Sequence, residues 1–272
     1  MSKCNLPTAL EKEMRIKELL NDCDGMAIAY SGGVDSTYLA DVAHETLGAK
    51  ALMIIADSPS IPRSELREAI SLAQERRWRL EVVSTREFDS PDFLKNDVKR
   101  CYYCKGELFE VMRRYADEHD IAAIAYGETA EDGFDATRVG AQAAREGGAR
   151  APLAEVGFNK EEIRERSRAR GLPTWNKASF ACLASRVPTG TPVSADILGK
   201  IEKAEELLRG IGCHQYRARH HDAICRIEVS EDDFALLMRP DIRHDIVDTV
   251  RALGYRYVTL DLAGYRTGST TG

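Results

Sequence analysis

The sequence predicts an α/β protein in which helices cover both faces of a parallel β-sheet and a smaller α+β domain follows. In the first half of the chain, short apolar runs alternate with longer segments of helical periodicity, as in proteins with buried parallel strands. The last third instead places two neighbouring strand-like runs between helices. A length of 272 residues suits one large domain or two modest ones. We therefore expect a first domain over residues 1–180 and a second over residues 181–272.

Apolar periodicity places the elements of the first domain. Strands are expected at residues 26–30, 51–56, 80–83 and 121–126. Helices are expected at residues 8–20, 35–47, 64–75 and 101–116. In open parallel sheets, ligands bind beyond the carboxyl ends of the strands, so the segments after these strands are candidates for the site.

The part between the sheet and the second domain is less regular. Residues 127–152 are rich in glycine, alanine and charge and are expected to form a loop with one short helix. Asn159, with Glu162 three residues later, is a capping signal for a helix that ends at Gly171. Residues 175–191 are expected to be an extended connection.

The second domain is expected to contain a helix, two strands, two helices and a last strand. Its helices are expected at residues 195–210, 232–238 and 241–253, and its strands at residues 216–221, 223–229 and 255–262. In the second of these strands, Cys225, Ile227 and Val229 alternate with the polar residues Arg226 and Glu228. Because alternate residues of a strand point to opposite faces, the three apolar side chains are expected to face the core.

Charge and composition exclude several function classes. The 38 basic and 44 acidic side chains give a net charge of −6, which argues against binding nucleic acid or anionic lipid. The first residues are charged and no long apolar run occurs, so we expect neither a signal peptide nor a membrane span. Seven cysteines in such a chain indicate the reducing cytoplasm, where cysteines serve metal binding or catalysis more often than disulfides.

A glycine-rich loop, residues 31–36 with the sequence SGGVDS, follows the first expected strand and opens a helix. Glycines let the backbone approach phosphate oxygens closely, and the helix N-terminus adds partial positive charge. The Walker pattern with its lysine and the dinucleotide pattern G-x-G-x-x-G are both absent. The loop therefore predicts a phosphate site of another type, the alternative being an ordinary turn that happens to be glycine-rich.

This loop resembles the S-G-G-x-D-S signature of the PP-loop ATP pyrophosphatases, which cleave ATP between the α and β phosphates. The resemblance implies a PP-loop sheet in which Asp35 helps to hold magnesium and pyrophosphate. It also implies that Asp57, after the second strand, lies near the adenosine, although a capping role is the alternative. The ATP-binding residues expected on this basis, with ATP and Mg²⁺ as cofactors, are Ser31, Gly32, Gly33, Asp35, Ser36 and Asp57.

Three of the cysteines lie in two separate motifs. Cys101 and Cys104 begin a helix, where their spacing puts both thiols on one face and the helix N-terminus favours the thiolate. Cys182 lies far along the chain, near the expected domain join. A thiolate is the form that binds metal or acts as a nucleophile. The other cysteines have no such context: Cys4, Cys23, Cys213 and Cys225.

Four segments in order along essentially the whole chain resemble the LarE family of ATP-dependent sulfur transferases. They are residues 101–105 (CYYCK), residues 175–186 (from WNK to CLASR), residues 188–192 (PTGTP) and residues 257–262 (YVTLDL). That family helps to build the nickel-pincer cofactor of lactate racemase. The resemblance implies that ATP adenylates a carboxylate of pyridinium-3,5-biscarboxylic acid mononucleotide and pyrophosphate leaves. Sulfur then displaces AMP to give a thiocarboxylate.

The resemblance implies two sources for the sulfur. One branch of the family sacrifices the sulfur of a single cysteine and leaves dehydroalanine, whereas another holds a [4Fe–4S] cluster with a labile sulfide on three cysteines. Cys101, Cys104 and Cys182 match the second branch and are the expected catalytic and cluster-binding residues. A sacrificial cysteine, a zinc site completed by His214 or His220, and a redox disulfide are the alternatives.

Polar residues of the second domain are expected to share one face of two adjacent strands. Arg217, Arg219 and His221 alternate on the first strand, and Arg226 and Glu228 on the second. Arginine forks suit phosphate and carboxylate, although a solvated face with ordinary ion pairs has the same pattern. The family resemblance implies substrate or phosphate contacts at Lys105, Arg186, Arg217, Arg219 and Arg266. It also implies acidic positions for a divalent ion at Glu205, Glu228 and Asp233.

The expected function is therefore ATP-dependent sulfur transfer to a small pyridinium nucleotide in the cytoplasm, and the family resemblance implies a homo-oligomer. A tRNA-thiolating PP-loop enzyme, an amide synthetase and a non-enzymatic adenylate-binding module are the alternatives. The acidic net charge argues against a nucleic-acid partner, and amide synthesis has no need of the cysteine set. Pyrophosphate release that depends on the pyridinium substrate distinguishes these functions.

Overall fold

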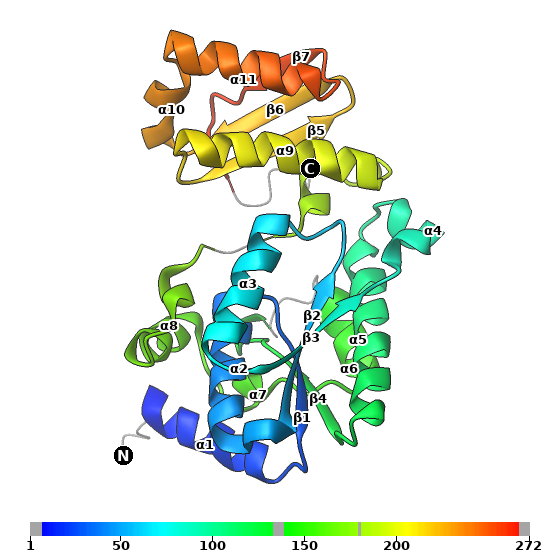
Figure 1. Ribbon diagram of the computed structural model, residues 1–272, viewed down its shortest axis with the longest axis vertical. Helices are drawn as coiled ribbons and strands as arrows, with labels where there is room; N and C mark the ends of the chain where they lie inside the picture. Colours follow the sequence, from blue (N-terminus) through cyan, green and yellow to red (C-terminus); the bar gives the residue numbers. More distant parts are fainter. Residues whose placement is uncertain (1–6, 133–138, 179–180, 267–272) are drawn as a thin grey trace, which may run out of the picture. The chain divides into compact units, whose positions relative to one another are not determined.

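The structure is a computed structural model that describes residues 7–132, 139–178 and 181–266. The chain forms two compact units (Figure 1). The first comprises Met1–Ser58, Arg63–Glu87 and Cys101–Phe180, and the second comprises Pro59–Pro62, Phe88–Arg100 and Ala181–Gly272. Two short segments from the N-terminal part of the sequence thus belong to the second unit.

The first unit contains a parallel sheet of four strands in the order β3-β2-β1-β4. The strands are β1 (Met26–Ala29), β2 (Ala51–Asp57), β3 (Arg79–Ser84) and β4 (Ala123–Tyr126). Each coincides with one of the four strands predicted from the sequence. β1 and β2 are apolar along most of their length because the sheet is covered on both faces. A parallel bridge between Ala125 and Arg150 covers the β4 edge.

Helices cover both faces of this sheet, which confirms the predicted α/β class. They are α1 (Ala9–Asn21), α2 (Val34–Leu47), α3 (Arg63–Glu75), α5 (Arg100–Glu118), α6 (Val139–Glu146), α7 (Pro152–Glu155) and α8 (Lys160–Ala169). On one face, α5 and α6 bury Phe109, Met112 and Ala144 against the sheet. Because crossovers between parallel strands are right-handed, α2 and α3 lie on the opposite face (Figure 1).

Local signals set the helix ends of the first unit. Thr8 and Glu11 form a capping box at α1, and Asn159 and Glu162 form the predicted one at α8. Gly171 follows α8 with a φ of 65°. The region predicted as a loop with a short helix contains α6, and its residues 133–138 lie outside the described residues.

A buried ion network joins α1, α2 and α8. Glu13 accepts hydrogen bonds from Tyr38 at 2.8 Å, Arg166 at 2.9 Å and Arg170 at 3.0 Å. Burial raises the pKa of the Glu13 carboxyl, but these bonds outweigh it and the pKa lies below its ordinary value. The network therefore fixes α8, whose first residue is Lys160, against the helix that follows the glycine-rich loop.

The second unit contains a three-stranded sheet in the order β5-β6-β7. Its elements are α4 (Pro91–Leu94), α9 (Ala195–Ile211), β5 (Tyr216–His221), β6 (Ile224–Val229), α10 (Glu231–Leu237), α11 (Pro240–Ala252) and β7 (Tyr257–Leu260). β6 is antiparallel to β5 and parallel to β7, and α9 and α11 pack against the sheet (Figure 1). Cys225, Ile227 and Val229 face the core of this unit, as predicted.

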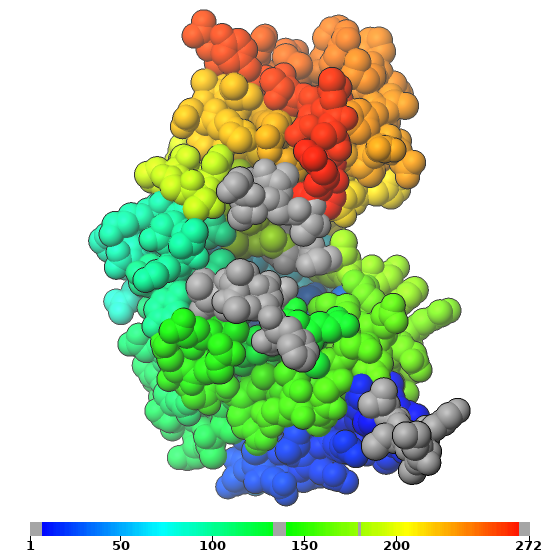
Figure 2. Space-filling model, turned by 180° about the vertical axis from the view of Figure 1, so that it is seen from behind, coloured from blue at the N-terminus to red at the C-terminus, as the bar shows by residue number. Residues whose placement is uncertain are grey.

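The chain after β7 lies on the surface of the second unit. Figure 2 shows this segment, in red, between the yellow and orange parts of the unit. The Tyr265 N–H donates to Val229 O at 2.9 Å, which attaches the segment to the end of β6. No helix in the described residues is long and apolar enough to cross a membrane.

A buried asparagine joins two segments of the second unit that are distant in sequence. Asn96 is fully buried, and its Nδ2 donates to Pro188 O at 2.9 Å and to Thr191 O at 2.8 Å. The Gly190 N–H donates to Asn96 O at 2.8 Å. The PTGTP segment is therefore held on the loop around Asn96. The extended connection predicted over residues 175–191 is wrong in part, because short 3-10 helices at Pro173–Asn176 and Leu183–Arg186 interrupt it.

Candidate functional site

The glycine-rich loop, residues 31–36, connects β1 to α2 at the carboxyl edge of the parallel sheet. Gly33 is the N-cap of α2, and no side chain caps that end. The Ser31 N–H donates to Ser36 Oγ at 3.1 Å, and the two hydroxyl oxygens of Ser31 and Ser36 lie 3.0 Å apart. The first-turn N–H groups of α2 therefore face outward at a helix N-terminus, which is an arrangement that binds phosphate.

Two close backbone approaches hold this loop in shape. Gly32 has a φ of 71°, and a Cβ at that position would lie 2.7 Å from Ala69 Cβ on α3. A Cβ at Gly127, just after β4, would lie 2.8 Å from the backbone nitrogen of Ser36. Since real Cβ contacts are essentially never so short, both positions require glycine.

Asp35 lies in the first turn of α2 and forms an ion pair with Lys160 through Oδ2. Within the described part of the chain, no group bonds its other oxygen, Oδ1, which is buried. An unsatisfied buried carboxylate oxygen is costly unless a ligand completes it. The donor is a hard oxygen beside a phosphate-binding helix end, and these features fit a magnesium ion bound with phosphates.

A pocket of 440 Å³ adjoins the loop on the side of α3. Lys177 reaches into this region, where its Nζ lies 2.5 Å from Glu65 and 3.4 Å from Gly32 O. Lys177 thus joins the segment after α8 to both α3 and the loop. The lining residues are Gly32, Glu68, Ala69, Ser71, Leu72, Glu75, Pro173, Thr174, Asn176 and Lys177.

Asp57, the last residue of β2, forms an ion pair with Arg63 at the start of α3. Arg63 also donates to Ser58 O, and the Ser58 hydroxyl donates to buried Glu87. The sequence leaves two roles open for Asp57, a nucleotide contact and a capping role. In this structure its carboxylate stabilises the turn between β2 and α3.

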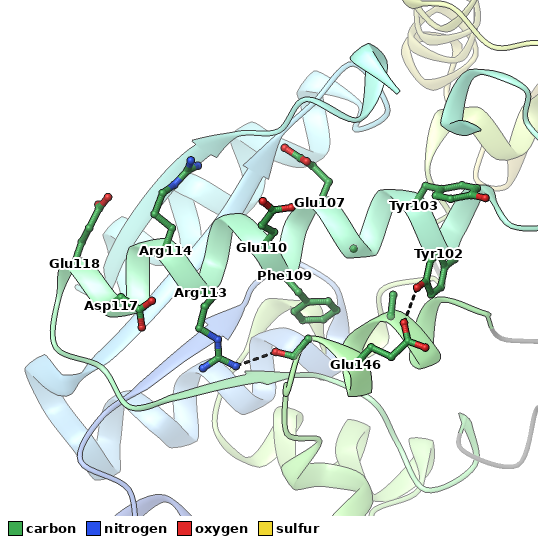
Figure 3. A pocket seen from close by; sticks show the side chains of 13 residues that line it. Tyr102, Tyr103, Glu107, Phe109, Glu110, Arg113, Arg114, Asp117, Glu118 and Glu146 are labelled. Carbon is green, nitrogen blue, oxygen red and sulfur yellow. Dashed lines mark hydrogen bonds between the residues drawn. The ribbon is translucent and has the colours of Figure 1, made fainter. Parts of the chain in front are cut away.

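The C-x-x-C pair lies in the first turn of α5, where Cys101 is exposed and Cys104 is partly exposed. A groove of 730 Å³ runs along α5 and α6 (Figure 3). In it, the Tyr102 hydroxyl donates to Glu146 at 2.5 Å and so ties the cysteine turn to α6. Lys105 Nζ lies 5.6 Å from the centre of the Tyr126 ring at the end of β4. The cysteine pair and Lys105 therefore share the N-terminal end of α5.

Cys182 belongs to the second unit and is the N-cap of the 3-10 helix Leu183–Arg186. Its side chain is partly exposed. Arg186 is 1% exposed and donates through Nη1 to Cys182 O at 2.9 Å. Its Nε and Nη2 donate to the two carboxylate oxygens of Glu205 at 2.9 and 3.0 Å.

The arginines of β5 and β6 share one face of the small sheet, as predicted. On this face Arg217 and Arg219 are buried, whereas Arg226 is partly exposed. Arg217 lies opposite Glu228 and Arg219 lies opposite Arg226 in the register. Arg219 Nη2 donates to Glu228 at 2.8 Å, and Arg226 Nη2 donates to the same carboxylate at 2.9 Å. Glu228 is fully buried. Arg219 therefore neutralises a carboxylate of the protein itself.

Arg217 differs from its neighbours. It is 9% exposed, its Nη1 donates to Tyr216 O at 2.6 Å, and its guanidinium lies 5.1 Å from the centre of the Tyr265 ring. No carboxylate of the described residues forms an ion pair with it. Burial and the nearby charge of Arg186 lower the pKa of the Arg217 guanidinium. Such a cation is stabilised by an added anion.

The expected divalent-ion site is not assembled in this structure. Among the described residues, no three His, Cys, Asp or Glu side chains form a group that could hold a metal ion. Glu205 and Glu228 are bound by arginines, and Asp233 accepts from the Ser230 hydroxyl at 2.7 Å and from the His214 N–H at 3.0 Å. Burial raises the pKa of the Asp233 carboxyl, but these hydrogen bonds outweigh it, so the pKa lies below its ordinary value.

The expected cluster ligands are divided between the units, with Cys101 and Cys104 in the first and Cys182 in the second. Each candidate fourth ligand has one ring nitrogen bonded within the second unit: His214 Nδ1 lies 3.1 Å from Asp233 Oδ1, and His220 Nδ1 lies 3.0 Å from the Tyr255 hydroxyl. The last expected contact, Arg266, is exposed on the segment after β7.

The cysteines without a motif divide into buried and peripheral positions. Cys213 and Cys225 are buried, and burial raises the pKa of their thiols to about 11 and about 12. Cys23 is partly exposed and donates to Leu19 O at 3.4 Å. Cys4 lies outside the described residues.

Two lysines of the site were not predicted from the sequence. Lys160 pairs with Asp35, and Lys177 contacts Gly32 O. Lys177 belongs to the WNK segment that carried the family resemblance, which was an available signal. Lys160 begins α8 directly after the Asn159 cap, and nothing in its local pattern points to Asp35.

Comparison with known proteins gives full-length relatives. The pyridinium-3,5-bisthiocarboxylic acid mononucleotide synthase of Lactiplantibacillus plantarum is 32% identical over 268 residues, which are 97% of this chain and 95% of that protein. An uncharacterized protein of Synechocystis sp. is 38% identical over 253 residues, 93% of this chain and 94% of its own length. An uncharacterized protein of Methanocaldococcus jannaschii is 28% identical over 239 residues, 88% of this chain and 90% of its own length.

No family model matches the chain. Identity above 30% along nearly the full length of both chains nevertheless establishes common descent with the synthase. The glycine-rich loop on a parallel sheet and the four ordered motifs agree with it. The chain belongs to the family of the pyridinium-3,5-bisthiocarboxylic acid mononucleotide synthase, the LarE family.

Proposed function

We propose that this protein is an ATP-dependent sulfur transferase that converts a carboxylate of pyridinium-3,5-biscarboxylic acid mononucleotide into a thiocarboxylate, with release of AMP and pyrophosphate. The product serves nickel-pincer cofactor synthesis for lactate racemase or a related enzyme. The observation that carries the proposal is the full-length similarity to a synthase named for the bisthiocarboxylic product. The loop after β1, with its uncapped helix end, supports the ATP-dependent step.

The first step is the activation of a carboxylate, which otherwise resists nucleophiles. A carboxylate oxygen of the substrate attacks the α-phosphorus of ATP, and the bond to the β-phosphate oxygen breaks. The N–H groups at the start of α2 would bind the phosphates, and Asp35 would hold a magnesium ion that accompanies pyrophosphate. Lys160, paired with Asp35, adds positive charge next to the leaving group.

The second step is the delivery of sulfur to the acyl-adenylate. In the sacrificial form, the thiolate of Cys182 attacks the acyl carbon and AMP leaves. Loss of the Cys182 α-proton to a base then cleaves its Cβ–S bond, giving dehydroalanine and the thiocarboxylate. In the three-cysteine form, Cys101, Cys104 and Cys182 would hold a [4Fe–4S] cluster, and a sulfide from it would displace AMP from the acyl carbon. The accessible cysteine pair on α5 supports the second form.

Arg217 is the residue of the second unit best suited to bind an anionic group of the substrate. Arg186 and Arg219 are paired with Glu205 and Glu228, whereas the buried Arg217 is paired with no carboxylate of the described residues. A phosphate or carboxylate of the substrate would stabilise its charge. Arg219, Arg266 and Lys105 are proposed as secondary contacts.

Pyrophosphate release tests this function. The protein, ATP and Mg²⁺ are incubated with and without the pyridinium substrate, and AMP and pyrophosphate are measured. Release that requires the substrate and falls about 100-fold in Asp35→Asn is expected. Asp241→Asn, which removes an exposed partner of Arg239 in the second unit, is the control. Stimulation by tRNA, or ammonia-dependent release, contradicts the proposal and favours the alternative enzyme classes.

The sulfur source is tested separately. Anaerobic reconstitution with iron and sulfide is expected to give a broad absorbance near roughly 400 nm, as thiolate-bound iron–sulfur clusters do. The absorbance should be lost when all three cysteines are replaced by alanine. If it never forms, and Cys182 loses the mass of H₂S on turnover, the sacrificial form is correct.

A homo-oligomer and a cytoplasmic location are also part of this proposal. They rest on the family resemblance and on cysteine usage. Light scattering of the purified protein tests the first, and fractionation of cells that produce it tests the second.

A further inference from the structure

Arg186 has the lowest exposure among the charged side chains described in the second unit, apart from Glu228. Its Nε and Nη2 face the two oxygens of Glu205 at 2.9 and 3.0 Å. Its Nη1 faces the other way, toward Ala181 O, toward Cys182 O at 2.9 Å and toward Ser185 Oγ at 3.1 Å. One guanidinium thus joins a carboxylate of α9 to the backbone around a cysteine.

Glu205 is itself fixed to the sheet. It lies in the middle of α9, and its Oε1 accepts the backbone N–H of Ala218 in β5 at 3.1 Å. Taking both charges out of water is unfavourable unless the hydrogen bonds are complete. Here both oxygens of Glu205 and both edges of Arg186 are bonded. The result is a rigid connection from β5 through Glu205 and Arg186 to Cys182.

We propose that Arg186 is a positioning residue that, together with Glu205, holds Cys182 for sulfur transfer. The hydrogen bond from Arg186 to Cys182 O fixes the backbone from which the Cys182 side chain projects. The next residue is also fixed, because the Leu183 N–H donates to Ser60 O at 2.8 Å. The family resemblance implied a phosphate contact for Arg186 and a metal for Glu205. The contacts of this structure instead occupy both side chains with each other and with the cysteine turn.

Lysine cannot replace this arginine. A guanidinium presents five N–H donors in a planar fork, so it can bond Glu205 and two carbonyls in opposite directions. An ammonium keeps the charge but has a single nitrogen on a flexible chain. Arg186→Lys is therefore expected to keep the pairing with Glu205 and to release the Cys182 turn.

Amide hydrogen exchange tests the positioning without any substrate. In Arg186→Lys and in Glu205→Gln, peptides covering residues 181–187 should exchange about tenfold faster than in the unchanged protein. Peptides from β6 and α11 should exchange as before. Tyr255→Phe is the control, because it removes the buried bond to His220 and leaves the cysteine turn alone. Unchanged exchange at 181–187, or an equal increase throughout the unit, overturns the proposal.

Kinetics of the same variants separate positioning from substrate binding. The catalytic consequence rests on the proposed function, but the exchange result does not, so failure of one is distinguishable from failure of the other. Arg186→Lys should lower thiocarboxylate formation about tenfold or more with an unchanged KM for the pyridinium substrate. A raised KM at unchanged kcat would show that Arg186 binds substrate and would contradict the proposal.

Discussion

The glycine-rich loop of the first unit and the arginine cluster of the second present different kinds of anion-binding group. The loop uses the backbone: its N–H groups stand at an uncapped helix end, and Asp35 keeps a buried oxygen that no described group bonds. The cluster, which comprises Arg186, Arg217, Arg219 and Arg226, uses side-chain charge, and the nearby carboxylates of Glu205 and Glu228 are already bound by arginines. In the loop, polar groups are left for a ligand to bond, whereas most charges of the cluster are already paired with carboxylates of the protein.

This difference separates residues that bind from residues that support. In the loop, the buried oxygen Oδ1 of Asp35 has no partner among the described residues. In the cluster, Arg217 is the arginine that is buried without a carboxylate partner among the described residues. Mutations in the loop should therefore affect chemistry, and most mutations in the cluster should affect stability.

The largest expected effect is on stability, from Arg219→Met. The substitution leaves the fully buried Glu228 with one arginine in place of two, and loss of one partner of a buried ion pair costs about 3–5 kcal/mol. Urea unfolding measures this loss. Arg239→Met, which breaks an exposed pair with Asp241, is the control and should cost less than about 1 kcal/mol. Equal losses for the two variants would contradict the supporting role of Arg219.

Next is Gly32→Ala, which tests the shape of the loop. Its φ of 71° disfavours alanine, and the new Cβ would meet Ala69 at 2.7 Å, so the loop must shift. We expect substrate-dependent pyrophosphate release to fall about 100-fold, because a shift of about 1 Å is enough to disrupt catalysis.

Gly48→Ala is the matched control for this prediction. Gly48 ends the same helix, α2, and has a φ of 56° with no atom within 4 Å of an added Cβ. Gly48→Ala therefore introduces the strain of a positive φ without the clash that Gly32→Ala causes in the glycine-rich loop. If both variants lose the same activity, the loop geometry is not the cause.

Arg217→Met should separate binding from stability within the cluster. Burial and the charge of Arg186 lower the pKa of Arg217, so the folded protein disfavours its charged form. Removing that charge should leave the free energy of unfolding unchanged or raise it by up to about 1 kcal/mol. The affinity for the pyridinium substrate should fall about 10- to 100-fold by calorimetry. A large loss of stability with unchanged affinity would contradict the assignment.

The smallest effect concerns thiol reactivity. Because burial raises the pKa of Cys213 to about 11 and that of Cys225 to about 12, at about pH 8 no more than about one in 1,000 of either is a thiolate. Iodoacetamide should label Cys101 and Cys104 first. The labelling of Cys213 and Cys225 should rise with pH. Peptide mass spectrometry measures the order. Labelling of Cys225 as fast as that of Cys101 would contradict it.

The same contrast explains what the sequence could predict. The fold class, the four parallel strands and the capping box at Asn159 follow from local patterns, and the structure confirms them. The loop was recognisable because its function needs glycines and a helix start in one continuous segment. The shared face of Arg217 and Arg219 also followed, since a period of two in neighbouring strands sets it.

Pairing between distant residues could not be predicted. Residues 186 and 205 lie on different elements, so no periodicity reveals that Arg186 bonds Glu205. For the same reason the sequence did not show that Lys160 meets Asp35. Nor did it show that residues 59–62 and 88–100 belong to the second unit. These features depend on packing, and a buried charge looks the same in sequence as a solvated one.

The measurement that tests the central claim most directly is the mass of the product. The protein is incubated with ATP, Mg²⁺ and pyridinium-3,5-biscarboxylic acid mononucleotide, and the substrate and the peptide containing Cys182 are analysed by mass spectrometry. We expect the substrate to exchange a carboxylate oxygen for sulfur, with one AMP and one pyrophosphate formed for each exchange. AMP and pyrophosphate without a thiocarboxylate, or ADP and phosphate in their place, would contradict it.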